Sequence, residues 1–416
     1  MASLAISVVV VSRNRPEWLR RCLSALRQLD YERFETIVVA CPSGAAIARE
    51  SGVDHVCDFD EANISAARNI GVDVASGEVV AFIDDDAVAE PTWLSHLAPA
   101  FEDQNVAQAG GTTLGRNGIS VQHGASRVDA WGRSYPVAQL GDAPFLVAVE
   151  ADRHPRVHGT NMALRRSAVI RHGGFDERYS FFLDETDLSY RLSCAGAQTK
   201  FVPKAVVHHA TGPSRFRDHA RTPRRVWDIA ASTAVFHGAH CPPEDRNTAQ
   251  AAFLAERRNW ILRHMQSGAL APDTAFALIK ELATGYAQGM NCTERPEPAW
   301  RQEQEQEQEQ DETPIKSLSA RDIYLVRSTN GQDDLSEKAR ALALDGHRVT
   351  VFDYRANARN HRVTYRDGYW LHSGGIFGRE LRSEPLFRKS TRQERITKTL
   401  QRITGIRSKK QPILGN

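Results

Sequence analysis

The chain has 416 residues, of which 41 % are hydrophobic and 25 % charged. These ordinary values exclude a wholly disordered, collagen-like or coiled-coil protein, and the length predicts two or three domains. The formal net charge is only +2, so the overall charge gives no reason to expect a nucleic-acid partner.

The N-terminal apolar run has no basic region ahead of it and is followed by arginine and proline, which favours a first β-strand over a signal peptide. No run of 18 apolar residues predicts a membrane-spanning helix. None of the six cysteines forms a CxxC pair, which excludes a zinc ribbon and a thioredoxin-type motif. We therefore expect a cytoplasmic protein.

The first hundred residues alternate apolar runs with amphipathic stretches. The runs are typical of strands buried on both faces of a parallel sheet, and they cover residues 6–11, 36–40, 55–59 and 79–83. After the first run, Pro16 can begin a helix, and further apolar side chains recur at helical spacing to face the sheet: Trp18, Cys22, Leu26 and Leu29. This order predicts a doubly wound, mainly parallel α/β sheet that binds ligands at the carboxyl ends of its strands.

Later segments change character, and the changes predict further units. Residues 110–155 have the composition of loops and short strands, whereas 217–290 are mainly helical in pattern. A QEQEQEQEQDE repeat indicates an acidic, solvated linker, and a strand–helix–strand pattern then follows over 322–327, 335–344 and 347–352. The predicted units are 1–215, a helical extension 216–293, the linker 294–317, a small incomplete Rossmann-like unit 318–378 and a basic tail 379–416.

The basic tail holds eleven lysines and arginines against three glutamates over residues 379–410. Such a tail is usually solvated. The alternative is a peripheral contact with anionic lipid on the inner face of the membrane.

The strongest chemical feature is the run Asp84-Asp85-Asp86, directly after the strand VVAFI. Three adjacent carboxylates repel one another, and a divalent cation relieves that repulsion. A strand-end acidic cluster therefore suits a metal–diphosphate. Taken alone, it could also be an Asp-rich turn that caps the next helix near Pro91.

The stretch NISAARNIGVDVASGEVVAFIDDDA resembles the family 2 glycosyltransferases of the GT-A fold. The resemblance includes the opening SVVVVSRNRPEWLRRCL and continues through GTNMALRRSAV, GGFDERYSFFLDETDLSYRLSCAG and VPKAVVHHATG, over roughly residues 4–215. It implies the GT-A nucleotide-diphospho-sugar transferase fold. It also implies inverting, metal-dependent transfer of a sugar from a nucleoside-diphosphate sugar to an acceptor hydroxyl, in polysaccharide or glycoconjugate synthesis, with a saccharide or lipid-linked acceptor.

The resemblance also assigns roles on the donor side of the site. Asp84 and Asp86 match the ends of the DxD motif and would hold Mg²⁺ or Mn²⁺ on the diphosphate, with Asp85 near the ribose. Arg68 matches the family arginine near the nucleotide, although by itself it could be a surface helix arginine. Ser12 is a further nucleotide candidate.

The second acidic cluster, Asp184-Glu185-Thr186-Asp187-Leu188, resembles the family's Glu-Asp-x-Asp-Leu motif, which supplies the catalytic base. Alignment on Asp187 places the base at Glu185, where the family more often has aspartate. Either carboxylate can accept a proton from a hydroxyl. Asp184 is the neighbouring candidate base, and Asp184 or Asp187 could instead cap the helix that follows.

Two further groups complete the resemblance. His209 of the His208-His209 pair stands where GT-A enzymes often place a third metal ligand. Gly159, Thr160 and Asn161 would line the donor-sugar pocket, although the same residues could form a simple turn.

One departure concerns the nucleobase. The family usually has an acidic residue after the second strand, where this chain has Cys41-Pro42-Ser43. UDP-, dTDP- and GDP-sugars therefore all stay open as donors.

The C-terminal stretches RDIYLVRSTNGQDDLSEKARALALDGHRVTVF and DGYWLHSGG are similar to the beginning of a family 4, GT-B glycosyltransferase. The nucleotide-binding half of that fold is absent, so this unit should not transfer sugar. A chain that ends near Glu294 is expected to keep catalysis.

Two other classes of function compete with the transferase. Paired carboxylates could serve a glycoside hydrolase, which needs neither a metal triad nor a nucleotide. A non-catalytic scaffold or pseudoenzyme could bind a sugar nucleotide and dock a partner through the C-terminal unit.

Overall fold

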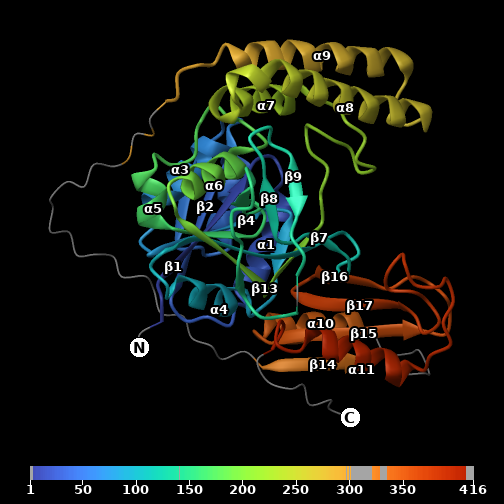
Figure 1. Cartoon of the computed structure of the whole chain (residues 1–416). Coiled ribbons are helices and arrows are strands. Elements are labelled where there is room, and N and C mark those ends of the chain that lie inside the picture. Colours follow the sequence, from blue (N-terminus) through green and yellow to red (C-terminus); the bar gives the residue numbers. More distant parts are fainter. Residues whose placement is uncertain are drawn as a thin grey trace, which may run out of the picture.

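The computed structural model contains a central α/β domain, a layer of three helices and a smaller C-terminal unit (Figure 1). It describes residues 3–139, 141–296, 298, 300, 321–327 and 335–408. The QE repeat of the predicted linker and the last eight residues of the predicted tail lie outside the described residues.

The central domain is built on a ten-stranded sheet in the order β10-β13-β6-β12-β4-β1-β2-β3, with β5 paired to β13 and β7 to β6. The neighbours β3, β2, β1 and β4 run parallel, as do β6 and β13, while β12 runs antiparallel to β4 and β6. The strands are β1 (Ile6–Ser12), β2 (Phe34–Ala40), β3 (His55–Asp58), β4 (Val79–Asp84), β5 (Ala87–Ala89), β6 (Val106–Leu114), β7 (Val121–His123), β10 (Phe145–Leu146), β12 (Met162–Arg165) and β13 (Gln198–His209).

Helices cover both faces of this sheet, and a small antiparallel sheet lies beside it. The helices are α1 (Pro16–Leu26), α2 (Pro42–Glu50), α3 (Ile64–Val74), α4 (Trp93–Leu97), α5 (Arg166–Arg171) and α6 (Asp184–Cys194), with a 3₁₀ turn at Ala98–Phe101. The small sheet pairs β8 (Ser126–Val128) with β9 (Ser134–Pro136) and β11 (His154–Arg156).

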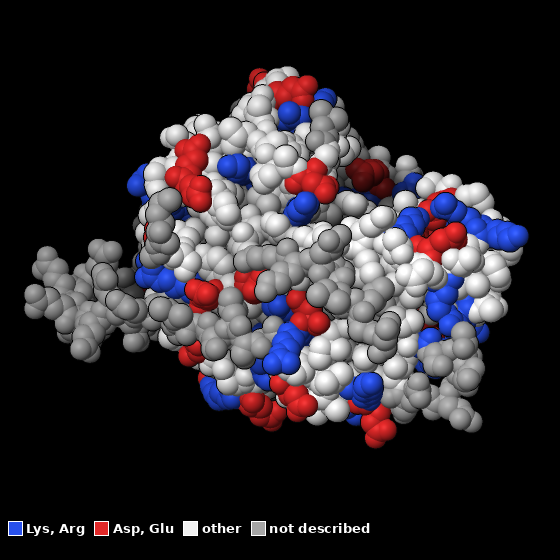
Figure 2. Space-filling model, turned by 90° about the horizontal axis from the view of Figure 1, so that it is seen from below, with Lys and Arg blue, Asp and Glu red and all other residues white. Residues whose placement is uncertain are grey.

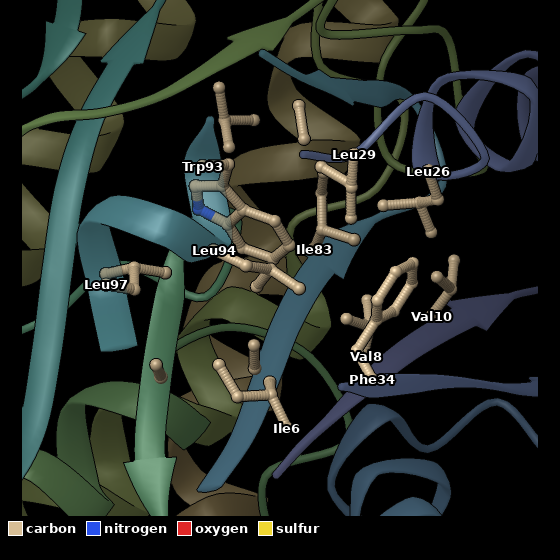
Figure 3. Close-up of a cluster of buried hydrophobic side chains, with 14 of the residues drawn as sticks. Ile6, Val8, Val10, Leu26, Leu29, Phe34, Ile83, Trp93, Leu94 and Leu97 are labelled. Atoms are coloured by element: carbon tan, nitrogen blue, oxygen red, sulfur yellow. The ribbon is translucent and has the colours of Figure 1, made fainter. Parts of the chain in front are cut away.

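The sheet has a hydrophobic core on each face because successive side chains of a strand point to opposite sides. Val8 and Val10 of β1 pack with residues of α1, α2 and α4 (Figure 3), whereas Val9 packs with residues of α3, α5 and α6. Strands buried on both faces explain why the apolar runs in the sequence are nearly continuous.

The buried face of α1 begins at Leu19, one residue later than the predicted start at Trp18. Leu19, Cys22 and Leu26 are buried against the sheet, but Trp18 is only half-buried. Trp18 lies at the edge of the apolar stripe and packs instead beside Gly212, where an added Cβ would stand 3.0 Å from the indole. The tryptophan therefore supports the segment that follows β13.

The helical layer consists of α7 (Trp227–His240), α8 (Arg246–Gln266) and α9 (Pro272–Met290), with a 3₁₀ turn at Pro243–Asp245. Two glycines one turn apart on α9 allow its backbone to approach α7 closely. A Cβ at Gly285 would lie 2.6 Å from the Trp227 carbonyl oxygen, and one at Gly289 would lie 2.3 Å from that of Ala231. None of the helices in the described residues has the length and apolarity needed to cross a lipid bilayer.

The C-terminal unit is a four-stranded sheet in the order β14-β15-β17-β16, with helices packed on it. Its elements are β14 (Asp322–Val326), α10 (Leu335–Leu344), β15 (Arg348–Arg355), β16 (Arg362–Arg366), β17 (Tyr369–Gly375) and α11 (Arg392–Ile403). The predicted strand–helix–strand pattern is therefore present, with α10 at its predicted bounds.

The segment predicted as a solvated basic tail includes α11, which is part of this unit's core. Ile396 and Ile403 are buried with residues of β14 and β15, and Thr391 and Glu394 form a capping box at the start of the helix. The excess of lysine and arginine in this segment led to the prediction of a solvated tail. The helix was missed because its apolar side chains recur only every three or four residues, between basic ones.

The C-terminal unit packs against the central domain through an apolar contact. Val363, Tyr365 and Trp370 form one cluster with Ala25 of α1 and Val88 of β5. The edge strand β16 also meets the central domain, since the Val363 amide donates to the carbonyl of Asn117 at 2.8 Å. This contact covers an edge that would otherwise be open to pairing.

A buried charged cluster anchors the same interface. The Arg407 guanidinium donates to both carboxylate oxygens of Glu90, at 2.6 and 2.9 Å, and also to His372 Nε2 at 2.7 Å. His208 Nε2 lies 2.8 Å from Glu90 Oε1. Burial alone would raise the pKa of Glu90, but Arg407 and His208 hold this pKa at about 2.

This cluster revises the expectation for a chain that ends near Glu294. Such a chain would lose Arg407, so the buried Glu90 carboxylate would no longer have its guanidinium partner. Glu90 also contacts His208, the residue that precedes the predicted metal ligand His209. We therefore expect the C-terminal unit to be needed for the stability of the central domain.

Replacement of Arg407 by methionine should destabilise the protein by about 3–5 kcal/mol, because it leaves a buried carboxylate without its cation. Urea denaturation near neutral pH measures the change. Arg258→Met, on an exposed position of α8, removes the same charge and should change the stability by less than about 0.5 kcal/mol. Equal denaturation midpoints for the two variants would contradict the anchoring role.

Candidate functional site

A cavity of about 580 Å³ lies at the carboxyl ends of β1, β2 and β4, the edge of the sheet at which the sequence predicts ligand binding. Four of the predicted site residues line it: Ser12, Asp84, Asp86 and His209. The other wall comes from the start of α3 and from residues 213–217, which follow β13.

Strand register brings three of these side chains together. Asp84 ends β4, Asp86 lies in the turn before β5, and β5 pairs with β13 so that Ala87 is opposite His209. One ligand atom from each of Asp84, Asp86 and His209 lies within 4.8 Å of the others. Two carboxylates and an imidazole in this arrangement suit a divalent cation.

The electrostatics of Asp86 keep its carboxylate ionised. Burial alone would raise its pKa, but His209, Arg15 and the Gly212 amide together hold this pKa well below the usual range. The Gly212 amide donates at 2.8 Å, and His209 Nε2 lies 3.2 Å from Asp86 Oδ1. The ionised form is the one that binds a metal.

Gln122 of β7 contacts the second ring nitrogen of His209, the one that does not face Asp86. Its Nε2 lies 3.0 Å from His209 Nδ1, while its Oε1 is buried with no hydrogen-bond partner among the described residues. Turning the amide over would let Oε1 accept from Nδ1–H. A metal-binding histidine usually has such an acceptor on its other nitrogen, so the residues present fit a cation.

The middle aspartate has a different place from its neighbours. Asp85 is fully buried and is not among the residues that line the cavity. It accepts from Ser12 Oγ at 2.7 Å and from Arg15 Nε at 3.1 Å. The side chains of successive residues in this turn point in different directions, and that of Asp85 accepts hydrogen bonds from Ser12 and Arg15.

Arg15 is a site residue that the sequence analysis did not single out. It pairs with Asp85 and also with Asp86, 3.1 Å from Oδ2, and it lines the cavity. Burial raises the pKa of Asp85 to about 7 against the opposing charge of Arg15. The sequence signal was the SRNRP run directly after the first strand.

Arg68 of α3 is buried between the two acidic clusters, so it is not a surface helix arginine. It forms an ion pair with Asp184, and its Nη2 lies 3.7 Å from Asp84 Oδ1. Burial raises the pKa of Asp184 to about 7, and the Arg68 charge opposes this rise. Arg68 thus connects the DxD aspartates with the DETD segment.

The Gly159-Thr160-Asn161 turn has three distinct environments. A Cβ at Gly159 would lie 2.5 Å from Arg68 Nη2, so only glycine leaves room for the guanidinium. Thr160 Oγ1 donates to Asp84 Oδ2. Asn161 was predicted to line the sugar pocket, but its amide is fully engaged in the core by two carbonyl oxygens and the Trp93 indole N–H.

The three acids of the DETD segment, on the first turn of α6, differ in exposure and partners. Asp184 is buried against Arg68, and Asp187 is buried against Arg191 and His240, at 2.8 Å from each. The Glu185 side chain is 14 % exposed and accepts from Arg156 Nη2 at 3.2 Å. Among these three acids, Glu185 has the most exposed side chain, since those of Asp184 and Asp187 are 3 % and 2 % exposed.

The chain before α6 is strained. Phe182 and Leu183 have φ of +77° and +66°, in the left-handed region that non-glycine residues seldom adopt. Two such residues in succession are held by the surrounding structure, and strain of this kind is concentrated at functional sites. Here these two residues directly precede the helix that carries the DETD acids.

The segment after β13 covers the cavity and was not anticipated from the sequence. The Phe216 ring stacks on Phe181, with centroids 3.7 Å apart, and Arg215 and Arg217 add positive charge to the cavity wall. Cys41, at the position where the family has an acid, does not line the cavity; its Sγ accepts from the Asn14 amide.

Comparison with known proteins places this site in context. Residues 7–173 match the family model of glycosyl transferase family 2. Pre-mycofactocin glycosyltransferase of Mycobacterium tuberculosis is 28 % identical over 303 residues, covering 70 % of this chain and 58 % of that protein. Succinoglycan biosynthesis protein ExoM of Rhizobium meliloti is 29 % identical over 231 residues, covering 51 % of this chain and 69 % of that protein.

Among solved structures, the mannosyltransferase PcManGT of Pyrobaculum calidifontis, in complex with GDP-Man and Mn²⁺, is similar with a TM-score of 0.43 and 16 % identity. The similarity covers 71 % of this chain and 89 % of that one.

The family match and the sheet order together confirm the predicted α/β fold class, GT-A with a mainly parallel sheet. The match ends before the helical layer and the C-terminal unit, so the likeness of residues 318–378 to a family 4 enzyme stays a prediction.

Gly159→Ala should destabilise the protein by about 1–3 kcal/mol, because the new methyl group displaces the buried Arg68 guanidinium. Thermal or urea denaturation measures the loss. Gly124→Ala is the control, since its Cβ would meet only one side-chain atom, at 3.9 Å. If both variants were equally stable, the close approach of Arg68 to this turn would carry no constraint.

Proposed function

We propose that the protein is an inverting, metal-dependent glycosyltransferase that moves a sugar from a nucleoside-diphosphate sugar to an acceptor hydroxyl during glycoconjugate or polysaccharide synthesis. The single observation that carries the proposal is the Asp84–Asp86–His209 cluster at the wall of a cavity large enough for a nucleotide. The family 2 match over residues 7–173 and the glycosyltransferase relatives support it.

In this proposal the donor occupies the 580 Å³ cavity. Its diphosphate lies toward Arg15 and Arg217, whose guanidinium groups attract phosphate oxygens, and toward the acidic cluster. Ser12 and Arg68 complete the nucleotide side. Mg²⁺ or Mn²⁺ bound by Asp84, Asp86 and His209 would neutralise the negative charge that develops on the diphosphate leaving group.

Glu185 is the proposed catalytic base. The acceptor oxygen forms its bond to the anomeric carbon as the bond from that carbon to the diphosphate oxygen breaks, and the acceptor proton passes to the Glu185 carboxylate. The Arg156 Nη2 group donates to Oε1 of that carboxylate at 3.2 Å and so fixes its position. Attack from the face opposite the leaving group inverts the anomeric centre and requires no covalent enzyme intermediate.

The first test concerns the metal. Asp86→Ala and His209→Ala should each weaken Mn²⁺ binding by at least about 10-fold, the scale at which even the outer partners of a metal site act. Calorimetric titration with MnCl₂ alone measures this, and transfer by the native chain should stop in excess EDTA. Asp58→Asn, an exposed acid of β3 paired with Arg49, is the control. Transfer that continues at full rate in EDTA would refute the metal dependence.

The second test concerns the base. Glu185→Gln should lower the turnover rate by about 10²-fold or more, while donor affinity stays nearly unchanged, because a general base acts only as the hydroxyl loses its proton. Rates are measured with the donor found by thermal-shift screening of UDP-, GDP- and dTDP-sugars with Mn²⁺.

Two neighbouring variants separate this role from structural ones. Asp187→Asn should chiefly lower thermal stability, since Asp187 binds Arg191 and His240. An active Glu185→Gln variant with an inactive Asp184→Asn variant would move the base to Asp184. Full activity in both would remove the base from this segment.

A further inference from the structure

A second cavity, of about 920 Å³, lies between residues 115–122 of the central domain and the C-terminal unit. Among the described residues its charged lining is strongly unbalanced, because it contains a single glutamate, Glu380, and five arginines: Arg116, Arg221, Arg362, Arg379 and Arg382. The proposed transfer reaction uses none of these residues.

Glu380, the one acid that the described residues give this cavity, is already neutralised by other groups. Glu380 is buried, and its Oε2 lies 3.0 Å from both Lys398 Nζ and Arg402 Nη1. Burial alone would raise the pKa of Glu380, but His361, Arg402 and Lys398 hold this pKa at about 2. Its charge is therefore directed at α11 and leaves the cavity arginines uncompensated.

The cavity arginines have few partners of their own. Arg221 donates to Thr211 and Arg379 to the carbonyl of Arg382. The side chains of Arg116, Arg362 and Arg382 are exposed and make no ion pair with a carboxylate in the part of the chain that the structure describes. Several guanidinium groups around one cavity repel one another unless an anion lies between them.

The positive surface continues beyond this cavity. A third cavity, of about 320 Å³, shares Asn360 and Arg362 with it and adds Arg355 and Arg359. The acid in its described lining, Asp353, pairs with Arg327 at 2.6 Å and with Arg355 at 3.2 Å. Figure 2 shows the molecule from below, with several Lys and Arg side chains gathered at the end formed by the C-terminal unit.

Apolar side chains stand beside these charges. Val121 and Leu381 line the arginine cavity and are 62 % and 40 % exposed. Leu386 and Phe387, a few residues further along the same segment, are 72 % and 60 % exposed. Large exposed apolar groups next to a cationic cavity fit a ligand that carries a charged head and an apolar tail.

We propose that this cavity binds the phosphate head group of an anionic lipid, with Arg116, Arg362 and Arg382 as its cationic partners and Leu381 against the apolar part. Arginine forks match phosphate oxygens in a bidentate manner, and anionic membrane surfaces attract such groups. The contact with lipid therefore runs through residues 116–122, 362 and 379–382. It does not depend on the lysines at the end of the chain.

The lipid site adjoins the donor cavity. Gln122 lines the arginine cavity and also contacts His209, and Arg221 binds Thr211 in the segment that covers the donor cavity. A lipid phosphate held here would lie next to the proposed transfer site without occupying it.

Co-sedimentation of the full chain with vesicles tests the proposal. The experiment is done in EDTA, which removes divalent cations from the proposed metal site. The chain should then bind phosphatidylcholine vesicles that contain phosphatidic acid, but should not bind vesicles of phosphatidylcholine alone. Binding should weaken as the salt concentration rises. Arg362→Gln with Arg382→Gln should weaken binding by roughly 10- to 30-fold, at about 1 kcal/mol for each arginine near the surface. Unchanged thermal unfolding verifies that this double variant is folded.

Matched controls separate a built site from diffuse charge. Arg258→Gln with Arg263→Gln removes two exposed charges from α8, in the helical layer, and should leave vesicle binding unchanged. Equal losses in the two double variants, or no binding of the native chain, would overturn the proposal.

Two further arms identify the source of the phosphate. Leu381→Ser should weaken vesicle binding while calorimetric binding of inorganic pyrophosphate in EDTA stays unchanged. Pyrophosphate binding through Arg362 and Arg382 without any vesicle binding would overturn the lipid as the ligand and assign the cavity to a free phosphate. Because none of these measurements uses sugar transfer, their failure is distinguishable from failure of the proposed function.

Discussion

A buried guanidinium between two groups of carboxylates organises the centre of this protein. Arg68 lies between Asp84 at the end of β4 and Asp184 at the start of α6, two elements that are distant in sequence. Without a cation there, the two acidic segments would repel each other at a place where the Asp184 carboxylate is buried away from water. The turn that begins at Gly159 is shaped around the same guanidinium, because a side chain there would occupy its place.

The C-terminal unit is coupled to that centre through β13. This strand ends in His208 and His209, whose side chains serve different parts of the molecule. His209 faces Asp86 at the donor cavity, and His208 faces Glu90, which is held by Arg407 of the C-terminal unit. Successive residues of a strand point to opposite sides, so one strand end joins the metal-binding geometry to the interface between the two units.

Much of the candidate site could be predicted from the sequence because its residues follow strands. Asp84, Asp86 and Ser12 each end or directly follow a run that is buried on both faces, and parallel strands bring such ends to one edge. Asp85 and Asn161 were assigned to the donor side by the family resemblance, and both side chains are buried in this structure. The direction of a side chain within a turn depends on backbone angles that residue spacing does not report. Arg15 was overlooked because its partners are 70 and 71 residues away.

The sequence by itself determined the doubly wound domain, the acidic cluster after β4 and the α10 helix, because periodicity and strand-end position are local properties of the chain. Only the tertiary structure decided which of the three DETD acids is most exposed and that one face of α11 in the basic segment is buried. It also brought five arginines from four segments of the described chain around one cavity. These features depend on which side chains lie next to one another, and which lack a partner, once the chain has folded. Pairing across more than a hundred residues is set by packing and electrostatics in three dimensions, which no local pattern contains.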